Sequence, residues 1–102
     1  MKECCKTYLD EQFGGDAGIV ADLYGEYAVS LRAKAAEAAA ALASGDWHAL
    51  DVAAHTVKGN SLAVGDDETA NIAIRLRQAA KLEDRAACAP LVADLEKALE
   101  TL

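Results

Sequence analysis

The sequence predicts an all-α protein: an antiparallel up-down four-helix bundle with a short extra helix at its N-terminus. Three observations support this fold class. Hydrophobic residues make up 53% of the 102 residues, and the most frequent of them is alanine, the best helix former. The chain has a single proline, and its glycines lie mostly between runs with helical periodicity. The connections between these runs are short, so consecutive helices should pack antiparallel.

The first two expected helices are separated by a glycine pair. A short first helix, with apolar positions at Cys5, Leu9 and Phe13, should end at Gly14-Gly15, since glycine commonly follows a last helical turn. Asp16 then caps a long second helix that runs to about residue 43. Its apolar residues recur in steps of three and four, as a buried helical face requires. They are Val20, Leu23, Tyr27, Leu31, Ala35, Ala38 and Leu42.

A third helix should follow the stop at Ser44-Gly45, with Asp46 as its N-cap. Its apolar positions again alternate in steps of three and four. They are Trp47, Leu50, Ala54, Val57, Ser61 and Val64. Gly65 should end this helix.

The fourth helix should begin after Asp66 or Asp67 and end near residue 82 or 83. Asp84 can cap a last helix, in which Leu91, Leu95 and Leu99 form the apolar face. Pro90 fits poorly in a helix interior, so this last helix either kinks at Pro90 or begins there.

Length and composition limit the function classes. A chain of 102 residues fits one domain, residues 1–102. The formal net charge of −7 argues against nucleic acid and against anionic membranes, which both bind cationic proteins. No apolar run approaches the roughly 20 residues that a membrane span needs, and no signal peptide is visible. The three cysteines are odd in number and lack metal-ligand spacing, which favours free thiols in the cytoplasm and no metal site.

The residues that indicate chemistry lie beside the core face of the third helix. His55 follows Ala54, a core position, so its ring should reach solvent from the edge of the core. A neutral imidazole nitrogen is a good nucleophile near neutral pH. Lys58, one turn further on, can offset negative charge on a phosphoryl group. Gly59 leaves the ring unobstructed, and its cost of about 1 kcal/mol in a helix suggests a functional reason.

The fourth helix should add positive charge to this site. If the turn centres near residue 66, an antiparallel arrangement places residue 77 level with residue 55. Arg77 and Lys81 are then candidates to stabilise the phosphoryl group or to steer an acidic partner. Asp51, one turn before His55, can form a hydrogen bond with it or simply lie in solvent. His48 lies roughly 10 Å from His55 by helix rise, too far for a shared metal ion.

The stretch AAHTVKGNSLAVG resembles the signature of histidine-containing phosphotransfer (HPt) domains. In that family an Ala-His-x-apolar-Lys-Gly core is followed by small residues and a helix-ending glycine. The flanking SGDWHAL, the early FGGD and the closing helix resemble the same family in order and spacing, so the likeness covers nearly the whole chain. Asn60 stands where a small residue is usual, Val57 where leucine is common, and Arg77 where a polar or acidic residue is frequent.

The resemblance implies a four-helix bundle in which His55 is the phosphorylated residue. It implies that Lys58 stabilises the phosphoryl group and that Gly59 gives the partner access. The implied partners are receiver domains of response regulators or hybrid sensor kinases. The Mg²⁺ of the reaction is then expected on the receiver, with no cofactor in this chain.

The leading hypothesis is a phosphorelay intermediate that accepts a phosphoryl group on His55 from a receiver aspartate and passes it to another receiver. The chain would be a phosphocarrier rather than an autonomous kinase, since it has no nucleotide-binding glycine loop. Val52, Thr56 and Leu62, with the facing part of the second helix, should form the docking surface. A monomer is expected. The alternatives are a non-catalytic module that binds and inhibits a kinase or receiver, and a purely structural bundle.

Overall fold

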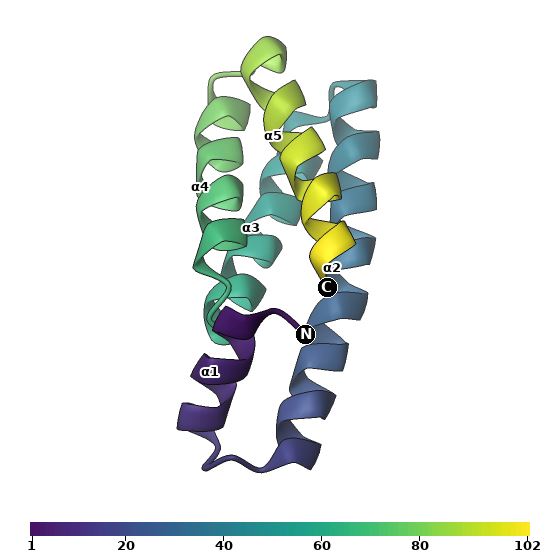
Figure 1. Cartoon of the computed structure of the whole chain (residues 1–102). Helices are drawn as coiled ribbons and strands as arrows, with labels where there is room; N and C mark the ends of the chain where they lie inside the picture. Colours follow the sequence, from purple (N-terminus) through teal and green to yellow (C-terminus); the bar gives the residue numbers. More distant parts are fainter.

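The computed structural model describes all 102 residues as five α-helices and one short 3₁₀ turn, with no strand (Figure 1). The prediction of an all-α fold is therefore confirmed. The elements are α1 (Glu3–Gln12), α2 (Ala17–Ser44), α3 (Trp47–Ala63), α4 (Asp67–Lys81), α5 (Arg85–Ala98) and η1 (Leu99–Thr101).

Helices α2 to α5 form a closed antiparallel bundle. Each helix packs against the next in the chain, and α5 returns to pack against α2. The diagonal pairs α2–α4 and α3–α5 do not approach each other closely, so the four helices enclose one core. α1 lies along the N-terminal part of α2, beyond the end of the other helices (Figure 1). The molecule is consequently elongated, with extents of 43 × 20 × 18 Å.

An aspartate caps the N-terminus of each bundle helix. The carboxylates of Asp16, Asp46, Asp66 and Asp84 accept hydrogen bonds from backbone N–H groups in the first turns of α2, α3, α4 and α5. These groups have no partner within the helix, so the caps fix where each helix begins. The sequence located all four boundaries, and the structure selects Asp66 over Asp67.

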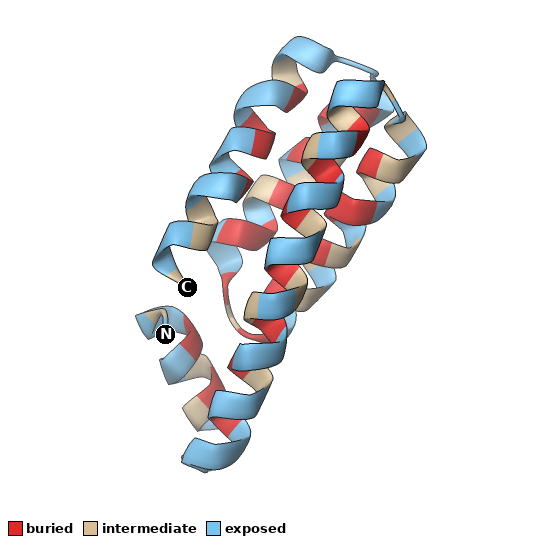
Figure 2. Cartoon of the chain, turned by 90° about the vertical axis from the view of Figure 1, so that its right-hand side faces the viewer, coloured by how far each residue is buried: buried red, intermediate tan, exposed pale blue.

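The buried residues form one stripe on each helix, turned toward the bundle axis (Figure 2). On α2 the stripe differs from the prediction at its ends, because Tyr24 and Ala41 are buried while Leu23 and Leu42 are only half-buried. Tyr24 is turned toward α1, where the backbone N–H of Lys2 donates to its hydroxyl at 3.2 Å. The extra helix thus changes which face of α2 is covered near its start.

Two aromatic residues at predicted apolar positions lie at the margin of the core. Phe13 is 43% exposed because α1 ends at Gln12, before the glycine pair, and leaves Phe13 beyond the last turn. Trp47 is half-buried and packs against the core from the start of α3. The guanidinium of Arg85 lies 5.7 Å from the centre of its ring, a cation–π contact that joins the start of α5 to α3.

Pro90 lies inside α5, which begins at Arg85. Of the two alternatives that the sequence left open, a start at Pro90 is wrong, because the Asp84 cap starts the helix one and a half turns earlier. Proline lacks the N–H that would bond to the carbonyl of Ala86. Both residues are exposed, so water can bind that carbonyl and the cost of the proline is reduced.

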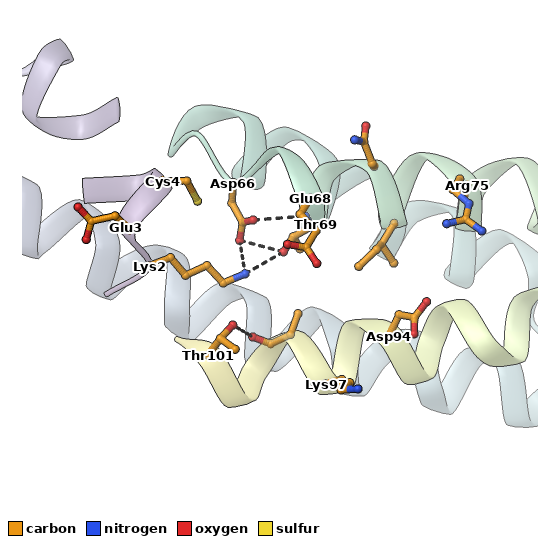
Figure 3. A pocket seen from close by; sticks show the side chains of 13 residues that line it. Lys2, Glu3, Cys4, Asp66, Glu68, Thr69, Arg75, Asp94, Lys97 and Thr101 are labelled. Carbon is orange, nitrogen blue, oxygen red and sulfur yellow. Dashed lines mark hydrogen bonds and ion pairs between the residues drawn. The ribbon is translucent and has the colours of Figure 1, made fainter. Parts of the chain in front are cut away.

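A buried polar cluster ties α1 to the α3–α4 turn (Figure 3). Asp66 is 1% exposed, and its Oδ2 accepts from the hydroxyl of Tyr27 at 2.7 Å, from Thr69 Oγ1 at 2.8 Å and from Lys2 Nζ at 2.9 Å. Burial alone would raise the pKa of Asp66, but these hydrogen bonds outweigh it and hold the pKa below its usual range. Asp66 is therefore an ionised link between four segments of the chain.

Tyr8 of α1 adds an apolar contact next to this cluster. It covers Gly65, which has a φ of +75°, and a Cβ added to Gly65 would lie 2.5 Å from the Cβ of Tyr8. Gly65 is thus needed for two reasons, the left-handed turn and the close approach of α1.

Replacing Asp66 by Asn should lower the free energy of unfolding by about 2 kcal/mol, because Asn satisfies fewer of the buried donors and leaves the Lys2 ammonium unpaired. Since the native pKa of Asp66 is lowered, its contribution is fully present above the ordinary aspartate value, about 3.9, and is lost as the pH falls through the native value. Urea unfolding between pH 7 and pH 2 measures both effects. Asp67 is exposed, so Asp67→Asn should change neither the stability nor its dependence on pH. Equal behaviour of the two variants would contradict the role of Asp66 as a buried, ionised link.

Gly65→Ala should destabilise the chain more than Gly45→Ala. Both glycines have φ near +70°, so both variants carry the strain of a left-handed alanine, of the order of 1 kcal/mol. Only the methyl group at residue 65 meets Tyr8, whereas the one at residue 45 meets the flexible end of Arg85 at 3.3 Å. Thermal unfolding of the two variants compares them directly, and equal losses would mean that α1 does not pack on the turn.

Candidate functional site

Helix α3 is packed by one face and open on the other. Its buried residues face α2 and α4. They are Leu50, Ala53, Ala54, Val57 and Ser61. His55 follows the fully buried Ala54 and is exposed, as the sequence predicted. It is also the central residue of α3, eight residues from each end, so the adjoining turns hold its backbone in place.

Two polar contacts join α2 to α3 beyond His55. The amide of Asn60 donates to Ser30 Oγ at 2.8 Å, and the Tyr27 hydroxyl lies 3.1 Å from the hydroxyl of the buried Ser61. The Asn60 amide therefore has a structural partner on α2. The two contacts join α2 to α3 between one and two turns beyond His55.

Neither His55 nor Lys58 has a polar partner within the chain. The His55 ring makes no hydrogen bond or ion pair. Lys58, on the following turn of α3, is half-buried, and its ammonium makes no ion pair either. A histidine and a lysine three residues apart on a helix are surface neighbours. Both side chains are thus available to a group that comes from outside.

Gly59 is exposed, and a Cβ added there would meet nothing within 4 Å. The packing of the chain therefore does not require glycine at this position. Glycine in a helix interior still costs about 1 kcal/mol relative to alanine. Because residue 59 has no side chain, the surface beside His55 is recessed.

Arg77, which the sequence predicted to lie level with His55, forms an ion pair with Asp51, one turn earlier on α3. Its Nε donates to Asp51 Oδ1 at 3.0 Å. Asp51 lies one turn before His55 on α3, so this hydrogen bond holds the Arg77 guanidinium on the Asp51 side of His55. The Arg77 guanidinium holds the pKa of the Asp51 carboxyl below its usual range, and the charges of Lys81 and His55 act in the same direction.

Comparison with protein families identifies the architecture. The family model described as Hpt domain matches residues 22–102, which include α3, α4, α5 and most of α2. The chain belongs to the Hpt domain family. Hpt domains carry out histidine phosphotransfer in phosphorelays and interact with receiver domains. No curated protein and no solved structure gives a significant match. α1 lies outside the matched region.

The residues expected at the docking surface of this Hpt domain lie on both sides of His55. Val52 and Leu62 are large exposed apolar side chains, at 50% and 47%. Thr56 is half-buried, and its hydroxyl donates to the carbonyl of Val52 at 3.2 Å, so it presents mainly its methyl group. On α4, Lys81 is exposed and makes no ion pair.

Sequence reasoning missed the Asp51–Arg77 pair, although opposite charges on adjacent antiparallel helices were the available signal. It could not find the Lys2–Asp66 pair, which joins residues 64 positions apart. No group of three or more His, Cys, Asp or Glu side chains in this Hpt domain could hold a metal ion. None of its helices has the length and hydrophobicity to cross a membrane.

Gly59→Ala and Gly25→Ala form a matched pair of variants. Both glycines lie in helices with open space around them, so each substitution should stabilise the chain by up to about 1 kcal/mol. Only the methyl group at residue 59 lies beside His55, and we expect it to slow phosphotransfer with a receiver domain roughly tenfold by displacing the partner. Equal transfer rates for the two variants would show that Gly59 does not provide access.

Proposed function

We propose that this Hpt domain is a phosphorelay intermediate. His55 accepts a phosphoryl group from the aspartate of one receiver domain and passes it to the aspartate of another. The observation that carries this proposal is the position of His55, exposed at the centre of the free face of α3. The other histidine, His48, lies in the first turn of that helix, beside the bundle end.

The proposed reaction needs one unprotonated ring nitrogen of His55. This nitrogen attacks the phosphorus atom of the aspartyl phosphate. A nitrogen–phosphorus bond forms while the bond from phosphorus to the carboxylate oxygen breaks, and the carboxylate leaves with the electron pair. The other ring nitrogen keeps its proton. Transfer to the second receiver is the reverse reaction, with a new carboxylate as the nucleophile.

Lys58 and Gly59 support this step from the next turn of α3. The Lys58 ammonium stabilises the negative charge on the phosphoryl oxygens, a principal source of catalysis in phosphoryl transfer. Gly59 allows the partner to bring its aspartate close to the ring. The Mg²⁺ that the reaction requires would be bound by the receiver, where it neutralises charge on the same phosphoryl group. The chain thus acts as a phosphocarrier and not as an autonomous kinase.

The docking surface would be made by Val52, Thr56 and Leu62, which flank His55 on α3, and by the neighbouring part of α2. Exposed apolar side chains next to a reactive group are typical of a protein interface. We place the protein in the cytoplasm, because its three cysteines are unpaired. We expect a monomer, since the four bundle helices already enclose the core within one chain.

Incubation with a phosphorylated receiver domain tests the proposal. The wild-type protein and the His48→Gln variant should take up a label that is labile in acid and stable in base, and His55→Gln should take up none. Lys58→Ala should be labelled roughly tenfold more slowly, because one stabilising charge is lost. Labelling of His55→Gln would contradict the assignment of His55 as the phosphoryl acceptor. If the wild-type protein and His55→Gln both inhibit a kinase or receiver, and the wild type takes up no label, the chain is instead a non-catalytic binding module.

A further inference from the structure

An ion pair lies one helical turn from His55. Asp51 and His55 are four residues apart on α3 and are therefore neighbours on its surface. The Arg77 side chain is 24% exposed and that of Asp51 30%, so solvent screens this pair less than the other surface charges. Lys58 lies on the opposite side of His55 along α3, and Lys81 lies one turn beyond Arg77 on α4.

The negative charge of the Asp51 carboxylate is unfavourable for a phosphoryl group on His55. A phosphoryl group brings nearly two negative charges at neutral pH. An uncompensated carboxylate one turn away would repel it, as like charges at this spacing do on any helix. Since the pKa of Asp51 is lowered, the carboxyl group stays ionised, and protonation does not remove its repulsion of the phosphoryl group. Its charge must be compensated by a cation, and Arg77 is the side chain bonded to it.

We propose that Asp51 and Arg77 form a compensated charge pair beside His55, in which Arg77 neutralises the carboxylate that would otherwise oppose the phosphoryl group. This inference rests on the proposed function of His55. Arg77 is then a positioning residue that acts through Asp51, and it need not touch the phosphoryl group. The pair sets how the phosphoryl group is shared between His55 and the receiver aspartate at equilibrium.

A variant with both Asp51 and Arg77 replaced distinguishes a compensated charge pair from a direct contact between Arg77 and the phosphoryl group. If Arg77 only compensates Asp51, Arg77→Gln and Asp51→Asn should act in opposite directions, and the variant with both changes should behave like the wild type. If Arg77 instead binds the phosphoryl group, the double variant should stay as defective as Arg77→Gln. Arg75→Gln, an equal change of charge at an exposed position on α4, is the control.

The first measurement uses the protein alone. In a His48→Gln background, the only histidine ring signals in the NMR spectrum belong to His55, and their titration reports the local charge. Arg77→Gln should move this titration to higher pH, since a bare carboxylate favours the charged imidazole. Asp51→Asn should move it to lower pH, and the double variant should return it close to the starting value. An unchanged titration in Arg77→Gln would overturn the proposal, whatever the outcome of phosphotransfer.

The second measurement is the equilibrium ratio of phosphorylated His55 to phosphorylated receiver. Arg77→Gln should lower this ratio roughly two- to fivefold, as expected for a doubly charged group beside an unpaired carboxylate. Asp51→Asn should raise it, and the double variant should lie within about twofold of the wild type. A double variant as low as Arg77→Gln would overturn the compensated pair in favour of a direct contact. Absence of label on wild-type His55 would instead contradict the proposed function, while the titration would still report on the pair.

Discussion

The one-sided packing of α3 is the constraint on which the rest of the site depends. The helix is held between α2 and α4 by a narrow stripe in which Ala53, Ala54 and Ser61 let the neighbouring helices come close. Because this stripe provides all of the burial that α3 needs, the opposite face is free to carry exposed polar and apolar residues. His55 occupies the centre of that face, where the helix is supported in both directions. A rigid helix thereby presents a reactive ring with no partner of its own.

The N-terminal helix α1 lies outside the part of the chain that matches the Hpt family, but it is attached to the bundle. α1 is joined to the α3–α4 turn by Lys2, which reaches Asp66, and by Tyr8, which covers Gly65. The turn determines how α4 is aligned against α3, and this alignment brings Arg77 to Asp51.

The amount that the sequence could predict differs between the fold and the site. Hydrophobic spacing and aspartate caps define the helices and their order, because both depend on neighbours in the chain. The same spacing places His55 next to buried Ala54, so its exposure followed from periodicity alone. Periodicity does not determine which side chains pair between two helices, so the Asp51–Arg77 ion pair did not follow from it. Asp66 was recognised as a cap, but its bonds to Lys2 and Tyr27 depend on the tertiary structure.

The central claim is that the phosphoryl group is carried by His55. Mass spectrometry of the phosphorylated protein tests it most directly, with digestion and fragmentation at neutral or basic pH to preserve the nitrogen–phosphorus bond. We expect a single modified peptide from α3, with fragment ions that locate the phosphoryl group on residue 55. A phosphoryl group on His48 or on a carboxylate, with residue 55 unmodified, would contradict it.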